Sequence, residues 1–455
     1  MTRQYEETKL TAISPLDGRY KDKLAPVSDY FSEASLIKHR FLVEIEWLLY
    51  LTNLPEFSDF KITDANRKFL KGIINNFSLV EAKGVKAIEE VLRHDVKAVE
   101  KYIQQLLQIN NLSKLAPLVH FGLTSEDVNS TAYSLLIKGF YDNCWQKEAK
   151  NLLNNINQLA QKTKQKAMVA RTHGQVATPT TMGKEMEVFY HRLARQNSLL
   201  ADQEYLAKFS GASGNFNVHH FTFPQIDWPQ QATIFLRTLN LKNNPYTTQI
   251  ESHDFLAEIF HNLIRWNSIL LDFCRDIWSY IALGYFQQAT NIKEVGSSTM
   301  PHKVNPIDFE NAEGNLGLAN SLFNHLASKL PISRWQRDLT DSTVLRNVGV
   351  AWGHSLLAIQ SIEKGLSKLT LNEQKLTDDL SLSWELLAEP LQSILRLMGR
   401  VDAYEVVKDK VKGKKLDLES WQLLVEELAL PPHYRQRLLD LTPHTYLGYS
   451  DIQIK

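Results

Sequence analysis

The sequence predicts a mainly α-helical protein, and its clearest helix follows His253. Apolar residues recur there at steps of three and four, the spacing of an amphipathic helix, at Phe255, Ile259, Leu263, Trp266, Leu270, Phe273, Ile277, Tyr280 and Leu283. No proline or glycine interrupts residues 254–283, so at 1.5 Å per residue this helix would extend about 45 Å. Alternating patterns typical of strands are scarce.

Similar helical patterns occur in three further stretches, residues 148–165, 180–209 and 310–329. Helices of this length usually belong to bundles. Glycine, proline and small polar residues gather in four segments, residues 124–129, 171–180, 210–217 and 296–306. Because such residues favour turns and helix termini, we expect the four segments to lie at or between helix ends.

The composition excludes several classes of protein. The chain has 455 residues, enough for two or three domains, and its 51 Lys and Arg balance 51 Asp and Glu. This balance argues against a protein built as a whole to coat nucleic acid or an anionic membrane. The N-terminal stretch lacks the apolar core of a signal peptide, and the longest apolar run, residues 277–286, has about half the length of a membrane span. We therefore expect a cytoplasmic protein.

No pattern in the sequence indicates a metal or cofactor site. Cys144 and Cys274 stand beside aromatic residues in helical patterns, without CxxC or mixed His/Cys spacing, and we interpret both as thiols that pack in the interior. The glycines of SGASGNFN, residues 210–217, lack the preceding strand and the spacing of a dinucleotide-binding turn. We expect no metal, flavin, nicotinamide or pyridoxal group.

The segment richest in catalytic side chains is GSSTMPHKVNP, residues 296–306. Glycine gives its backbone freedom and two prolines restrict its later path, while Ser297, Lys303 and Asn305 offer a hydroxyl, a positive charge and an amide. A serine pair alone would more often cap a helix in a surface turn. The complete string is far more specific than the pair, and such a loop could close over an anion.

This string resembles the signature loop of the fumarase/aspartase superfamily, GSSxMPxKxNP, at every fixed position. Two further segments agree with that superfamily, HFGLTSED at residues 120–127 and RTHGQVATPT at residues 171–180. The histidine after Met-Pro is typical of adenylosuccinate lyases, which the chain also resembles in SPLDGRY, RHDVKAVE, NPYTTQIESHD and RWQRDLTDSTVLRN. The resemblance therefore covers nearly the full length.

The resemblance implies a fold of three domains with a central bundle of long helices. The implied borders are residues 1–111 for an N-terminal helical domain, 112–364 for the bundle and 365–455 for a C-terminal helical domain. In similar enzymes the long helices of four subunits form the core of a homotetramer, and each active site takes residues from three chains. A long helix after His253 is consistent with such an assembly.

The resemblance also implies a reaction, the β-elimination of fumarate from adenylosuccinate, giving AMP, and from SAICAR, giving AICAR, in purine nucleotide biosynthesis. A proton leaves the carbon beside a carboxylate and an amine nitrogen leaves the neighbouring carbon, so two proton transfers are required. By analogy Ser297 is the general base, and His173 protonates the leaving nitrogen with help from Glu310. Lys303 and Asn305 would stabilise the dianionic intermediate. Taken alone, His173 would more often be structural.

A larger set of residues is implied to bind the substrate. Arginine forks and hydroxyls suit a phosphate monoester, although each member taken alone would be an ordinary surface or helix-end residue; Asn311, for example, stands where we expect a helix to begin. The set is Arg19, Tyr20, Arg93, His94, Asp95, His120, Thr124, Ser125, Gln249, Ser298, Asn305, Asn311, Arg337, Ser342, Thr343 and Arg346.

Two alternatives remain open at this point. Argininosuccinate lyase, fumarase and aspartase share the signature loop, so only residues at the substrate end distinguish them; His302 and the arginine-rich residues 334–347 favour a phosphorylated purine. A non-catalytic structural or binding protein could also use the same scaffold. The presence of Ser297, His173, Lys303 and Glu310 together argues against this second alternative.

Overall fold

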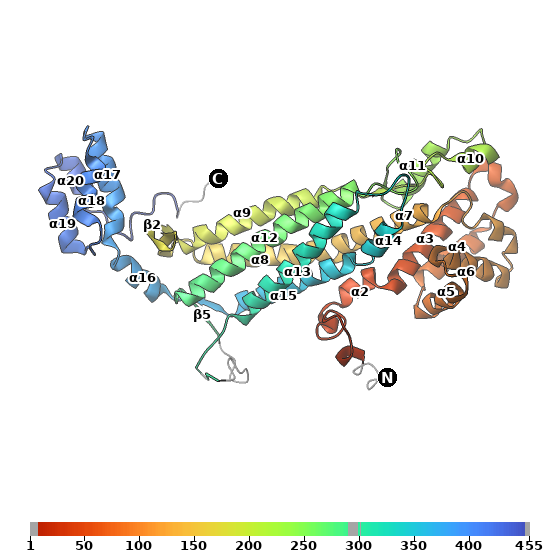
Figure 1. The fold of residues 1–455 in the computed structure, drawn as a ribbon, viewed down its shortest axis with the longest axis horizontal. Helices are drawn as coiled ribbons and strands as arrows, with labels where there is room; N and C mark the ends of the chain where they lie inside the picture. Colours follow the sequence, from red (N-terminus) through yellow and green to blue (C-terminus); the bar gives the residue numbers. More distant parts are fainter. Residues whose placement is uncertain (1–7, 290–298, 301, 451–455) are drawn as a thin grey trace. The chain divides into compact units, whose positions relative to one another are not determined.

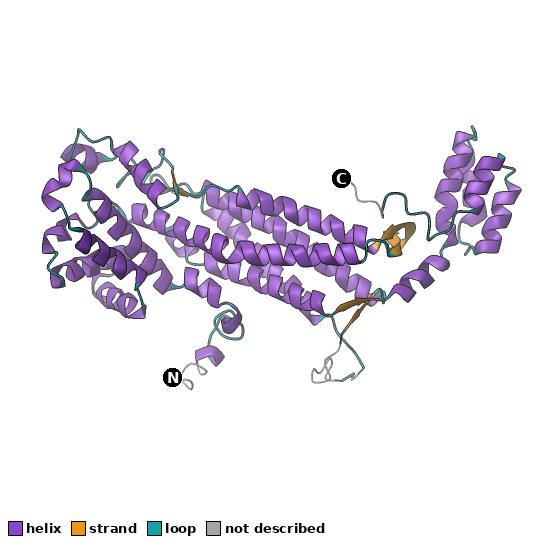
Figure 2. Ribbon diagram, turned by 180° about the vertical axis from the view of Figure 1, so that it is seen from behind, coloured by secondary structure: helices purple, strands orange, loops and turns teal. Residues whose placement is uncertain are grey.

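The computed structural model describes residues 8–289, 299–300 and 302–450. Helices dominate this part of the chain, and its six short strands pair two by two into three small sheets (Figure 1, Figure 2). The prediction of a mainly α-helical fold is confirmed. The described residues pack into two units, of which the first draws on residues 1–149, 196–268 and 314–358 and the second on 150–195, 269–313 and 359–455.

Long helices contribute residues to both units. They are α8 (Gln146–Lys162), α9 (Met182–Ala201), α12 (Asp254–Ala282), α13 (Ile307–Lys329) and α15 (Val348–Ser367). The helix predicted after His253 is α12, which has 29 residues; the apolar residues of its pattern are buried as far as Ile277, and only Tyr280 and Leu283 are partly exposed. The pattern over residues 180–209 extended too far, because residues 180–181 belong to a strand and α9 ends at Ala201.

The first unit contains most of the shorter helices. Its elements are η1 (Lys21–Lys23), α2 (Ala25–Phe31), α3 (Glu33–Leu51), η2 (Pro55–Phe60), α4 (Asp64–Asn75), α5 (Leu79–Leu92), α6 (Asp95–Ile109), η3 (Ser113–Leu118), α7 (Ser125–Phe140), the π-helical turn η4 (Tyr141–Trp145), β3 (Leu206–Ala207), α10 (Asn217–Thr222), α11 (Trp228–Thr238), β4 (Lys242–Asn243) and α14 (Thr340–Leu345). Side-chain caps set several helix starts. The Ser32 side chain accepts from the Ser35 amide at α3, and Ser78 and Glu81 form a capping box at α5.

Large aromatic side chains fill the core of the first unit. Trp145, Trp266 and Trp352 are fully buried, and the ring centroid of Trp145 lies 5.2 Å from Trp266 and 4.7 Å from Trp352. Phe323 of α13 adds a further edge-to-face contact with Trp352 at 5.7 Å. Such rings bury large apolar areas and prefer these tilted arrangements. They join η4, α12, α13 and α15 within this unit.

The second unit carries the remaining strands and the C-terminal helices. Its elements are β1 (Ala167–Thr172), β2 (Gln175–Thr181), β5 (Phe286–Gln288), β6 (Leu369–Leu371), α16 (Glu373–Ser381), η5 (Trp384–Leu387), α17 (Ala388–Leu397), α18 (Ala403–Val411), α19 (Leu418–Glu427) and α20 (Pro432–Leu439). The helices from α17 onward surround a core of their own, in which Trp421 is fully buried and donates its indole N–H to the Leu438 carbonyl at 3.0 Å.

The four segments rich in glycine, proline and small polar residues differ in structure. Residues 171–180 form most of an antiparallel hairpin of β1 and β2 rather than a plain loop. Residues 125–129 already belong to the first turns of α7, with Thr124 as the residue before the helix. Residues 210–217 connect β3 to α10, whereas residues 296–298 and 301 lie outside the described residues.

Other expectations from the sequence have mixed outcomes. Cys144 and Cys274 are buried, unpaired thiols, as predicted. None of the helices in the described part of the chain has the length and hydropathy to cross a bilayer. The three domain borders stay a prediction.

Replacement of a buried tryptophan should reveal how much the aromatic core of the first unit contributes. We expect Trp352→Ala to lower the free energy of unfolding by about 3–5 kcal/mol, because it removes a fully buried ring and leaves a cavity. Trp335→Ala is the matched control, since that side chain is 94% exposed. Thermal unfolding measures both; equal shifts of the two midpoints would contradict the assignment of the core.

Candidate active site

Arg93, His94 and Asp95 occupy the sharp turn between α5 and α6 of the first unit. Arg93 ends α5 in the left-handed conformation, with a φ of 57°, and this reverses the chain direction. The His94 ring then caps α6, because its Nδ1 accepts the backbone N–H of Lys97 at 3.2 Å. Asp95 follows in the first helical turn, where the helix dipole favours a negative charge.

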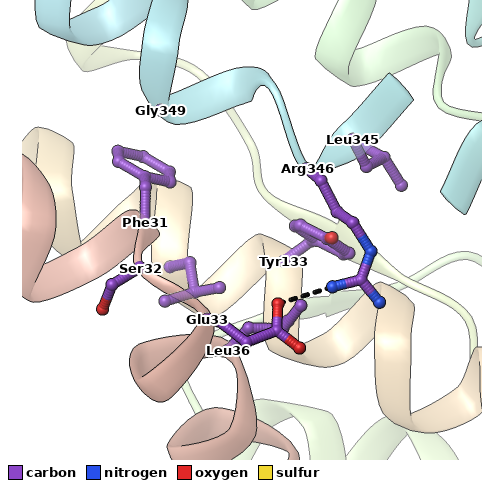
Figure 3. Close-up of a pocket in the computed structure, with 9 residues that line it drawn as sticks. Phe31, Ser32, Glu33, Leu36, Tyr133, Leu345, Arg346 and Gly349 are labelled. Carbon is purple, nitrogen blue, oxygen red and sulfur yellow. Dashed lines mark hydrogen bonds and ion pairs between the residues drawn. The ribbon is translucent and has the colours of Figure 1, made fainter. Parts of the chain in front are cut away.

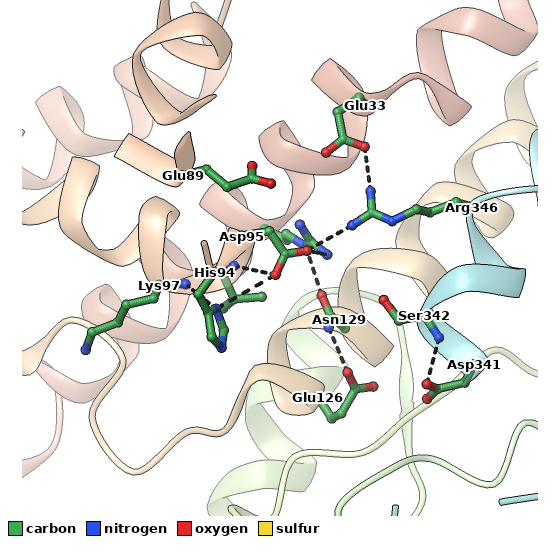
Figure 4. Close-up of polar contacts among 12 residues, drawn as sticks. Glu33, Glu89, His94, Asp95, Lys97, Glu126, Asn129, Asp341, Ser342 and Arg346 are labelled. Atoms are coloured by element: carbon green, nitrogen blue, oxygen red, sulfur yellow. Dashed lines mark hydrogen bonds and ion pairs between the residues drawn. The ribbon is translucent and has the colours of Figure 1, made fainter. Parts of the chain in front are cut away.

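Arg346 lies directly after α14 and contacts Asp95. Its Nη2 lies 2.9 Å from Asp95 Oδ2, and its Nη1 donates to Glu33 Oε2 at 2.6 Å (Figure 3, Figure 4). Arg346 and Glu33 border a cavity of about 110 Å³ that is also lined by Phe31 and Tyr133. The Arg346 side chain is 36% exposed, so part of its fork can still meet a ligand.

Arg337 and Gln249 form a second pair in the first unit. Arg337 Nη1 donates to Gln249 Oε1 at 3.2 Å, and Nη2 lies 2.9 Å from the buried Glu126 carboxylate. Gln249 in turn donates to the Ala212 carbonyl at 2.9 Å. Burial raises the pKa of Glu126, although the charge of Arg337 opposes this shift.

Ser342 and Thr343 lie on α14, four and three residues before Arg346. The Ser342 backbone N–H donates to Asp341 Oδ1 at 2.6 Å, and Figure 4 shows Ser342 in the same group of polar side chains as Asp95 and Arg346.

His120 is paired with a fully buried carboxylate. Its Nδ1 lies 2.6 Å from Glu44 Oε1, and the two side chains are 20% and 0% exposed. Burial disfavours the imidazolium, but the charge and hydrogen bond of Glu44 outweigh burial and raise the pKa of His120 above its ordinary value. The histidine is thereby oriented and biased toward its charged form.

A buried ion pair supports the start of α7, where the candidates Thr124 and Ser125 lie. Asp127 Oδ2 accepts the Thr124 backbone N–H at 2.7 Å as part of a capping box. Its Oδ1 lies 2.7 Å from Lys208 Nζ, with both side chains fully buried. The same oxygen accepts the backbone N–H groups of Ser210 at 2.8 Å and Gly211 at 3.2 Å. The Asp127 carboxylate therefore connects the TSED segment, residues 124–127, to residues 210–211.

His173 lies in the second unit, at the tip of the β1–β2 hairpin. His173 and Gly174 form the two-residue turn with φ angles of 53° and 74°, the positive values that suit the twist of such hairpins. The ring is exposed. The hairpin is anchored below the turn, where Arg171 Nη1 donates to the Tyr285 hydroxyl at 2.9 Å and Tyr285 donates to Asp379 Oδ2 at 2.9 Å.

The remaining described catalytic candidates surround the start of α13, also in the second unit. Lys303 is exposed and precedes this helix, as does Asn305. Glu310 lies in the first turn, where its Oε1 accepts the Trp278 indole N–H at 3.1 Å. Asn311 accepts the Ser361 hydroxyl at 2.8 Å; because α13 begins at Ile307, Asn311 lies inside the helix rather than at its start.

Four candidates are left. Ser297 and Ser298 lie outside the described residues, and Arg19 and Tyr20 lie next to each other in the first unit. Arg19 stays near the N-terminus, where its guanidinium carbon lies 5.8 Å from the Tyr20 ring centroid. The structure thus collects the recognition candidates Arg93 to Ser125, Gln249 and Arg337 to Arg346 in the first unit, and His173, Lys303 and Glu310 in the second.

Sequence reasoning missed the buried charged residues that hold this arrangement, among them Arg40, Glu44 and Lys208. One signal was available: Arg40 and Glu44 stand at helical spacing within the apolar face of α3, between Ile37 and Leu48. A charge on such a face requires a buried partner. Among the described residues, no three His, Cys, Asp or Glu side chains come together as metal ligands would.

Comparisons with known proteins identify the family of the chain. A family model described as lyase matches residues 18–319, and one described as adenylosuccinate lyase C-terminal matches residues 333–447. The adenylosuccinate lyase of Vibrio cholerae is 46% identical over 448 residues, 98% of each chain. The chain belongs to the adenylosuccinate lyase family. The Escherichia coli K12 member is 46% identical over 445 residues, 97% of this chain and 98% of its own.

Solved structures of two other enzymes share the fold. A fumarate lyase from Mesorhizobium sp. BNC1 has a TM-score of 0.74 at 18% identity and covers 94% of this chain and 96% of its own. A 3-carboxy-cis,cis-muconate lactonizing enzyme from Pseudomonas putida has a TM-score of 0.71 at 20% identity, with 94% of each chain covered. The resemblance to the fumarase/aspartase superfamily is thus confirmed, and family membership makes the chain an enzyme of the lyase class.

The pairing of His120 with Glu44 predicts a pH effect. Because the folded pKa of His120 is raised, the pair stabilises the fold fully below the unfolded value of about 6.5, and this contribution is lost as the pH rises through the folded pKa. We expect Glu44→Gln to lower the His120 pKa in an NMR titration. Glu46→Gln, two residues further along α3, is the control; an unchanged His120 pKa in Glu44→Gln would refute the pairing.

Proposed function

We propose that the chain eliminates fumarate from adenylosuccinate, giving AMP, and from SAICAR, giving AICAR, by general acid and base catalysis. Family membership supplies the reaction class, and the placement of Arg346 is the observation that carries the choice of substrate. Its guanidinium is held by Asp95 and Glu33 beside a cavity, and the Arg346 side chain as a whole is 36% exposed. An arginine fork fixed in this way suits a phosphate monoester.

His173 serves as the proton donor to the leaving nitrogen in this proposal. The turn of a hairpin projects its ring into solvent, and an imidazole exchanges protons near neutral pH. The Arg171, Tyr285 and Asp379 contacts hold the base of the hairpin. The proton donor is therefore carried by a rigid element, which limits the loss of orientation during the reaction.

The segment before α13 supplies stabilisation of negative charge. As the proton leaves the carbon beside the carboxylate, charge accumulates on that carboxylate, where Lys303 and Asn305 can meet it. Both residues directly precede α13, whose N-terminus adds a partial positive charge. Glu310, oriented by Trp278, assists His173. Ser297 acts as the base, and its weakly acidic hydroxyl requires positive charge nearby and exclusion of water.

The active enzyme is a homotetramer in this proposal, with sites that take residues from three chains. The distribution of candidates supports it, because recognition groups gather in the first unit and the described catalytic groups in the second. The proposed location is the cytoplasm.

The substrate is tested by incubating the purified protein in parallel with adenylosuccinate, argininosuccinate and malate and separating the products by chromatography. We expect AMP and fumarate from adenylosuccinate alone. Turnover of argininosuccinate or malate instead would overturn the substrate assignment while preserving the lyase class. Turnover of none of the three would favour a non-catalytic homologue.

The role of Ser297 is tested by Ser297→Ala, which deletes a hydroxyl with little change in volume or charge. We expect kcat to fall by roughly 10²–10⁴-fold, while AMP binds with unchanged affinity, because the lost interaction acts in the transition state. Ser321→Ala removes an exposed hydroxyl of α13 that bonds the Gly317 carbonyl and serves as the control. Normal turnover by Ser297→Ala would exclude this serine as the base.

A further inference from the structure

Arg40 is a buried cation to which the reaction described above gives no role. It lies on the apolar face of α3, and its side chain is 1% exposed. Removing a guanidinium from water costs free energy unless good partners compensate it. Arg40 has two such partners, since Nη2 lies 2.8 Å from Asp95 Oδ2 and Nε donates to Asn129 Oδ1 at 2.9 Å.

The first partner leads to Arg346. Asp95 Oδ2 meets Arg40 from the interior and Arg346 Nη2, at 2.9 Å, from the exposed side. Burial alone would raise the pKa of Asp95, but the charge of Arg40, the Val96 backbone N–H and the charge of Arg346 together lower it. The carboxylate is therefore held in its ionised form as a bridge between two guanidinium groups.

The second partner leads to Arg337. Asn129 Nδ2 donates to Glu126 Oε1 at 2.7 Å, and the same oxygen accepts Arg337 Nη2 at 2.9 Å. Figure 4 shows Asn129 between Glu126 and Asp95, as this chain of contacts requires. Two series of polar contacts therefore start at Arg40, and they end at Arg346 and Arg337, the two arginines proposed to recognise the substrate.

Stability alone does not explain this guanidinium. Its Nη1 atom is buried without a hydrogen-bond partner among the described residues, and an unsatisfied buried donor is destabilising. An apolar side chain of similar volume often replaces a buried ion pair without loss of stability. The buried charge of Arg40 is explained by its role in orienting the polar groups that it contacts, Asp95 and Asn129.

We infer that Arg40 is a positioning residue for substrate recognition. Through Asp95 it orients the guanidinium group of Arg346, and through Asn129 and Glu126 it orients that of Arg337. Side chains that are already oriented lose less freedom when a ligand binds. Arg40 itself touches no substrate in this scheme. The inference rests on the proposed function for the identity of the substrate.

The test is Arg40→Lys, which keeps the positive charge but lacks the planar fork that serves Asp95 and Asn129 together. We expect the KM for adenylosuccinate and the Kd for AMP to rise by about tenfold, with kcat changed by less than about twofold, because ground-state recognition is lost rather than chemistry. Circular dichroism and thermal unfolding report whether the variant folds. An unchanged KM and Kd in a folded variant would overturn the inference.

A second variant keeps the inference testable should Arg40→Lys fail to fold. Asn129→Ala removes the whole link between Arg40 and Glu126 and leaves the Arg40–Asp95 ion pair in place, so we expect KM to rise by about threefold, and the double variant to match Arg40→Lys because the two residues act in one chain. The matched control is Asn267→Ala, a buried asparagine that accepts the Ser355 hydroxyl away from these chains. It should lower thermal stability without changing KM. Equal KM values in Asn129→Ala and Asn267→Ala would refute the positioning role.

The inference and the proposed function fail in different ways. A wild-type protein that neither turns over adenylosuccinate nor binds AMP removes the proposed function and with it the inference. An active wild-type protein whose Arg40→Lys variant loses kcat and keeps its KM contradicts the inference alone.

Discussion

The ionised carboxylate of Asp95 is the contact on which the placement of Arg346, the proposed phosphate-binding arginine, depends. A buried positive charge must be compensated, and Asp95 compensates Arg40 on one side while it orients Arg346 on the other. The backbone places the carboxylate there by a left-handed Arg93 and a capping His94. A local turn geometry thus determines where an arginine fork can face a ligand.

Carboxylates also hold the other recognition groups of the first unit. His120 is held by Glu44, Arg337 by Glu126, and the TSED segment by Asp127 with Lys208. In each case a fully or nearly buried carboxylate orients a group near the surface. The catalytic candidates of the second unit are placed differently, by a hairpin turn at His173 and by the start of α13 at Lys303 and Glu310. Rigid elements that carry short exposed segments are well suited to hold reacting groups.

Local patterns predicted the long helix α12 well, because its apolar period is written in neighbouring residues. The hairpin at residues 171–180 was missed, since its small polar residues and glycine masked the alternation of a strand and indicated a loop instead. The motifs indicated His173, His120 and Arg346 as site residues. Their supporting partners were not predicted, because the Arg40–Asn129 and Glu44–His120 contacts join residues separated by 89 and 76 positions. No local pattern specifies such pairs.

The central claim is that recognition and proton transfer are contributed by different parts of the chain and combined between subunits. Mixing Arg346→Ala with His173→Ala, two variants expected to lose turnover at low substrate concentration, tests it most directly, with native mass spectrometry to confirm that subunits have exchanged. The account predicts that fumarate production returns in the mixture, because some sites then combine an intact His173 from one subunit with an intact Arg346 from another. Mixed tetramers that stay inactive would contradict it.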